Sequence, residues 1–136
     1  MGTQQILLIV LSLILVGAAV SMGIIMFDSQ ARTQARNALI TECINFAIQA
    51  QAWYRTPQIM KGGEGKFEAS DIDSILRFLN NGSVGDILTP TGTYTISAGS
   101  GHTVYIIGVS SAHANVQVTV NVRLDGTGDG NGIVWE

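Results

Sequence analysis

The sequence predicts an α+β fold: a long N-terminal helix, with an apolar half and an amphipathic half, packed on a small antiparallel β-sheet head. Three observations predict it. Residues 1–27 carry no charged side chain, and residues 28–55 contain no proline or glycine. The remainder includes runs in which apolar and polar residues alternate between glycine-rich turns, as in half-buried strands. We therefore expect the helix over residues 1–55, with the apolar half at 1–27, and the head over residues 56–136.

The apolar half contains an uninterrupted run at residues 6–27. As a helix this run would measure about 33 Å, enough to cross the hydrocarbon core of a bilayer. Three interpretations remain open: a secretory signal peptide, a single-span anchor, and a segment that leaves the membrane to pack among copies of itself. A signal peptide is disfavoured because residues 1–5 carry no basic side chain and the run is long.

Small residues spaced four apart favour the third interpretation. Gly17 pairs with Ser21 and Ala19 pairs with Gly23 at the spacing that lets two helix backbones approach closely. Each glycine also costs about 1 kcal/mol relative to alanine within a helix. Any break in the long helix is therefore expected between Gly17 and Gly23.

The amphipathic half runs from Asp28 to Arg55, and Pro57 is expected to end it. Apolar residues recur there at steps of three and four, which predicts one stripe facing the head. The stripe contains Ala31, Ala35, Ala38, Leu39, Cys43, Phe46, Ala47, Ala50 and Tyr54, widened by Ile40, Ile44 and Ile48.

The head is expected to begin with a glycine-rich loop and a short helix. Ser70 and Asp73 have the spacing of a capping box at the start of this helix, and Asn81–Gly82 would end it. The strands that follow are predicted at residues 93–97, 103–109, 116–124 and 133–135, joined as an antiparallel meander.

Charge and cysteine content exclude some functions and structures. The net charge is −3, and no basic run exists, so there is no electrostatic footprint for nucleic acid. Cys43 is the only cysteine, which excludes a disulfide within the chain. Its apolar neighbours predict a buried thiol that packs as a small hydrophobe.

The sequence contains few residues arranged for catalysis or metal binding. His102 and His113 have no partner at ligand spacing, so we expect surface or strand-end residues and no catalytic site. The loop after the last long strand resembles a calcium loop, with acidic residues at positions one, five and twelve and glycine at six. A plain glycine-rich turn is the interpretation we favour, with calcium as the alternative; the candidate ligands are Asp125, Thr127, Asp129 and Glu136.

The order of apolar helix, amphipathic continuation, glycine-rich loop and antiparallel sheet resembles the type IV pilin superfamily. The resemblance implies that Met1 is the first residue of the mature subunit, a position where the family carries phenylalanine or methionine. Gln5 occupies the place of a glutamate that is thought to pair with a neighbouring subunit's N-terminal amine. The chain also departs from the family in having no proline in the apolar run and no C-terminal disulfide loop.

The resemblance implies a structural subunit of an extracellular filament on the cell surface that polymerises with itself through the N-terminal helix. Before assembly the subunit would lie in the inner or cytoplasmic membrane. The residues expected to serve assembly are Met1, Gln4, Gln5, Gly17, Ser21 and Gly23. A minor component of a secretion or uptake machine and a membrane-anchored binding domain remain as alternatives.

Overall fold

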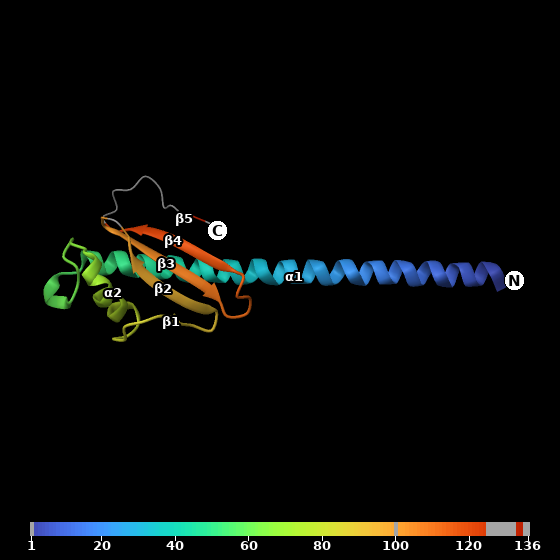
Figure 1. Cartoon of the computed structure of the whole chain (residues 1–136), viewed down its shortest axis with the longest axis horizontal. Helices are drawn as coiled ribbons and strands as arrows, with labels where there is room; N and C mark the ends of the chain where they lie inside the picture. The colour runs from blue at the N-terminus through green and yellow to red at the C-terminus, as the bar shows by residue number, and fades with distance from the viewer. Residues whose placement is uncertain (1, 100, 125–132, 135–136) are drawn as a thin grey trace. The chain divides into compact units, whose positions relative to one another are not determined.

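A computed structural model of the chain describes residues 2–99, 101–124 and the backbone of residues 133–134. It has the predicted α+β fold, with a long N-terminal helix and a small antiparallel sheet (Figure 1). The helical elements are α1 (Gly2–Arg55), η1 (Gln58–Met60), η2 (Ala69–Asp71) and α2 (Ile72–Leu79). The strands are β1 (Ile87–Leu88), β2 (Gly92–Ala98), β3 (Thr103–Ser110), β4 (Gln117–Arg123) and β5 (Ile133–Val134).

The chain forms two compact units, Met1–Gln34 and Ala35–Glu136. The second half of α1 therefore belongs to the same unit as the sheet. We call this second unit the head, and we call the described residues 2–27 of the first unit the apolar segment.

The sheet is the expected meander, with antiparallel strands in the order β1-β2-β3-β4-β5 among the described residues. Its register places buried residues of neighbouring strands in shared rows. Tyr94 pairs with Gly108, which pairs with Val118, and Ile96 pairs with Ile106, which pairs with Val120. Because side chains alternate along a strand, these rows all lie on one face of the sheet.

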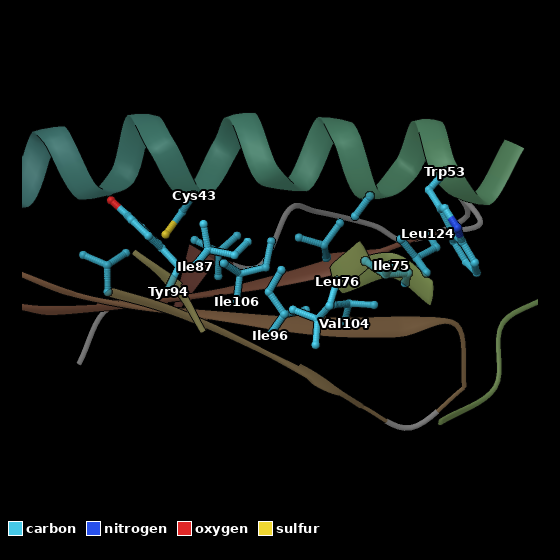
Figure 2. Packing of buried hydrophobic residues seen from close by; sticks show 14 of the residues in the cluster. Cys43, Trp53, Ile75, Leu76, Ile87, Tyr94, Ile96, Val104, Ile106 and Leu124 are labelled. Atoms are coloured by element: carbon cyan, nitrogen blue, oxygen red, sulfur yellow. The ribbon is translucent and has the colours of Figure 1, made fainter. Parts of the chain in front are cut away.

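That face packs against the second half of α1, as Figure 2 shows. Leu39, Cys43, Ala50 and Trp53 are the buried residues of α1, and their spacing follows the helical period. Two details differ from the prediction. Ile44 and Ile48 are exposed, because they lie to one side of the buried stripe. Trp53, which we did not place in the stripe, is only 2% exposed.

The helix α1 is continuous from Gly2 to Arg55, and Pro57 follows its end as expected. The local weakness expected between Gly17 and Gly23 does not break it. In the described structure, helical hydrogen bonding therefore outweighs the low helix propensity of two isolated glycines.

The expected start of the short helix, Ser70, lies in the 3-10 turn η2, and α2 itself begins at Ile72. The capping box is formed by Glu68 and Asp71, each of whose side chains accepts a hydrogen bond from the other's backbone N–H, and not by Ser70 and Asp73. The end agrees with the prediction: Asn81 has φ of 49° and Gly82 donates to the Arg77 carbonyl. Strand β1 was not predicted, because two residues are too short to display alternation.

Candidate functional site

The candidate site is the surface of the apolar segment. Every described residue from Gly2 to Gln30 is exposed, although this stretch carries most of the large aliphatic side chains of α1. Phe27, at its end, is 77% exposed. Among the described residues, α1 is the one helix that is long and apolar enough to cross a membrane. A continuous apolar surface of this size marks contact with lipid or with other protein.

The hydroxyls of the two serines inside the apolar segment are satisfied within the helix itself. The Ser12 hydroxyl donates to the Ile9 carbonyl at 2.8 Å, and the Ser21 hydroxyl donates to the Gly17 carbonyl at 2.9 Å. A hydroxyl that bonds to its own helix can enter an apolar environment without leaving an unpaired donor. These serines therefore do not prevent burial of the segment.

The small residues form two strips on different sides of α1. Gly17 and Ser21 form one strip, and Ala19 and Gly23 form the other. Because a helix turns about 100° per residue, positions 17 and 19 lie about 200° apart, on nearly opposite sides. A Cβ added at Gly17 or Gly23 would meet nothing within 4 Å in the described chain. Each side of the segment can therefore receive a closely packed neighbour.

Gln4 and Gln5 lie in the first turns of α1, and both are exposed. Their amide groups lie at the end of the helix that carries unsatisfied backbone N–H groups. Met1 lies outside the described residues, so the proposed partner of these amides, the N-terminal amine, is not placed. At the other end of the apolar run the Arg32 side chain forms an ion pair with Asp28 at 3.0 Å, where charged residues begin.

A polar cluster that the sequence did not predict lies where α1 enters the head. The Glu42 carboxylate accepts a hydrogen bond from the Thr89 hydroxyl at 2.8 Å. The Thr91 hydroxyl lies 2.8 Å from that of Thr89 and 3.1 Å from that of Tyr94. Burial raises the pKa of Glu42, but hydrogen bonds from Thr91, Tyr94 and Thr89 outweigh it and hold this pKa below its usual value.

The Cys43 thiol is buried, and the two histidines lie near the ends of strand β3. Cys43 is fully buried, and burial, with a further contribution from the charge of Glu42, raises the pKa of its thiol to about 12. Such a thiol is unreactive at neutral pH. The His102 ring contacts Tyr54 edge-on, with ring centroids 5.8 Å apart, and the backbone N–H of His113 donates to the Ser110 hydroxyl.

No group of three or more histidine, cysteine or acidic side chains that could hold a metal ion occurs among the residues that the structure describes. The calcium candidates Asp125, Thr127, Asp129 and Glu136 lie outside those residues. The calcium alternative therefore stays a sequence prediction.

A comparison of the chain with models of known protein families, with curated proteins and with solved structures gives no match.

Proposed function

We propose that this chain is a structural subunit of an extracellular helical filament, of the type IV pilin kind, and that it polymerises through the apolar segment. One observation carries the proposal. Residues 6–27 present a continuous exposed apolar surface, whereas the head already has a buried core of its own. Such a surface requires a cover of lipid or of other protein.

Copies of the same segment supply that cover in the proposal. Burying apolar surface contributes about 25 cal/mol per Å², so side-by-side packing of apolar segments outside the membrane would be strongly favourable. The two strips of small residues, on nearly opposite sides of α1, favour an open array over a closed dimer. A subunit that receives one neighbour on each side uses different surfaces for the two contacts, which generates rings or helical filaments.

The membrane is the environment proposed for the subunit before assembly. The apolar run at residues 6–27 matches a bilayer core of about 30 Å, and its two serine hydroxyls are paired within the helix. The same features suit a permanent single-span anchor, which is the competing proposal. The two differ in what surrounds the segment after the protein reaches its final location.

Assembly from purified protein tests the proposal. The full chain, purified in a non-ionic detergent, is dialysed free of detergent with and without added phospholipid, then examined by sedimentation and negative-stain electron microscopy. We expect filaments of uniform width in the lipid-free sample. Amorphous aggregate without lipid, together with monomers in lipid nanodiscs, would instead support the single-span anchor.

A further inference from the structure

The head contains a groove of about 640 Å³ that the proposed function does not use. Its walls come from the end of α1, from the loop that follows α1, and from α2. The volume lies within the range of roughly 300–1,000 Å³ that is usual for small-molecule sites.

Positive charge gathers in this groove. Lys61, Lys66 and Arg77 line it, and they include both lysines of the chain. None of the three forms an ion pair among the described residues. Asp71 is the one carboxylate in the lining, and one of its oxygens already accepts a hydrogen bond from the Glu68 backbone at 2.9 Å.

This distribution contrasts with the charge of the chain as a whole. The chain has a net charge of −3, yet the groove gathers three cations and a single carboxylate. A concave surface with one sign of charge concentrates the opposite charge from solution. The groove is therefore electrostatically suited to an anion.

The loop that carries the lysines is held in a defined conformation. The buried Trp53 donates from its indole Nε1 to the Lys61 carbonyl at 3.0 Å, and Gly63 donates from its backbone to the Trp53 carbonyl at 3.0 Å. A Cβ added at Gly63 would lie 2.7 Å from the Trp53 ring and 2.8 Å from the Lys66 carbonyl. The backbone at both lysines is thus fixed against Trp53, which reduces the ordering entropy that a ligand must offset.

The remaining lining adds apolar contact and hydrogen-bonding groups. Phe78 is 47% exposed, which leaves ring surface open to a ligand. Gln58, Ser74 and Asn81 bring amide and hydroxyl groups into the same groove. A sugar ring carries C–H groups that pack on an aromatic side chain and hydroxyls that bond to amides. A carboxylate on that sugar makes charge-assisted hydrogen bonds with lysine and arginine.

We propose that this groove binds an acidic saccharide, with the sugar carboxylate paired with the Lys61, Lys66 and Arg77 side chains and a sugar ring against Phe78. The inference is independent of filament formation, because every residue that carries it lies in the head. It gives the head a binding function in addition to its place in the subunit.

Calorimetric titration of the full chain in non-ionic detergent tests the proposal. Two matched pairs of probes are used: sialyllactose against lactose, and trigalacturonate against maltotriose. At least one acidic probe should bind, and its affinity should fall as salt is raised. Its neutral counterpart should bind at least tenfold more weakly. Lack of binding by both acidic probes, or equal binding by the neutral ones, would overturn the proposal.

Variants of the groove residues test where the saccharide binds. Inorganic phosphate tests whether a bare anion binds as well as the saccharide does. Lys66→Gln and Arg77→Gln should each weaken binding by about tenfold, since a charge-assisted hydrogen bond is lost. Arg55→Gln removes the same charge outside the groove and should bind like the unmodified chain. Unchanged melting temperature and tryptophan fluorescence verify folding, and two separate variants guard against one that misfolds. Equal losses in Arg55→Gln, or inorganic phosphate binding as tightly as the saccharide, would contradict the assignment.

Discussion

Glu42 and Thr89 are joined by a hydrogen bond of 2.8 Å, although they lie 47 residues apart in the sequence. The bond ties α1 to the turn between β1 and β2. Because a carboxylate only accepts, Thr89 is the donor to Glu42, and the hydroxyls of Thr91 and Tyr94 extend this contact into a chain of hydrogen bonds. Chains of this kind polarise one another and strengthen each member.

The Glu42 cluster should make the stability of the head depend on pH. The pKa of Glu42 lies below its usual value of 4.5. The stabilisation is therefore fully present above pH 4.5 and is lost as the pH falls through the lower pKa of the folded state. We expect Glu42→Gln to lower the free energy of unfolding by about 1 kcal/mol at pH 7, and by much less at pH 3. Urea unfolding followed by tryptophan fluorescence measures both differences.

Glu64→Gln is the matched control for this experiment, because Glu64 is exposed on the loop after α1. Its effect on the free energy of unfolding should be small, because the side chain is exposed. A difference between Glu42→Gln and the unmodified chain that is the same at pH 7 and pH 3 would show that the carboxylate charge contributes nothing.

Replacing Gly108 with any residue that has a side chain should destabilise the head. It pairs with Tyr94 across β2 and β3, and a Cβ there would lie 2.8 Å from the Tyr94 ring and 3.2 Å from the Cys43 sulfur. Overpacking a filled core costs about 1–3 kcal/mol. Gly108→Ala should lower the free energy of urea unfolding by that amount. Gly23→Ala, where the new methyl group meets nothing within 4 Å, should leave the head as stable as before.

A larger side chain in either small-residue strip should impair filament assembly. Ala18 and Ala19 are neighbours in α1, but they point about 100° apart, and only Ala19 belongs to a strip with Gly23. Ala19→Leu should hold neighbouring helices apart and reduce the filament yield after detergent removal, measured by sedimentation. Ala18→Leu makes the same change beside the strips and should assemble normally. Equal filament yields from the two variants would show that the small-residue strips do not contribute to assembly.

The glutamines at the start of α1 should aid docking. In the proposed pilin-like assembly, an N-terminal amine would enter an apolar environment, where an unpaired charge is very unfavourable. The carbonyl of Gln4 or Gln5 can accept a hydrogen bond from that amine. The double variant Gln4→Leu/Gln5→Leu should therefore assemble more slowly with its head still folded, in a light-scattering time course. Gln5→Glu should retain assembly, and normal kinetics in the double variant would show that neither side chain matters.

The sequence predicted those parts of the fold that depend on local periodicity. The α1 stripe from Leu39 to Ala50 and the long strands repeat their apolar residues often enough to be recognised. Trp53 lies three residues after Ala50, at helical spacing, but the neighbouring Tyr54 was placed in the stripe instead; the loop that supplies the Lys61 carbonyl holds the Trp53 indole. Strand β1 exists by pairing with β2, and its own two residues contain no pattern.

The candidate sites also differ in whether the sequence predicts them. The apolar segment is visible in the sequence because one continuous run of residues creates it. The Glu42 cluster and the groove bring together residues from separate elements, so no spacing in the sequence predicts them. The Glu68–Asp71 capping box was missed for a different reason: glutamate is not among the favoured N-cap residues.

The central claim is that the apolar segment is covered by copies of itself. Electron cryomicroscopy of the assembled protein, with helical reconstruction, tests this claim most directly. We predict a fibre in which residues 6–27 of each subunit contact the same residues of several neighbouring subunits. A structure in which residues 6–27 of a single chain are surrounded only by lipid or detergent would contradict it.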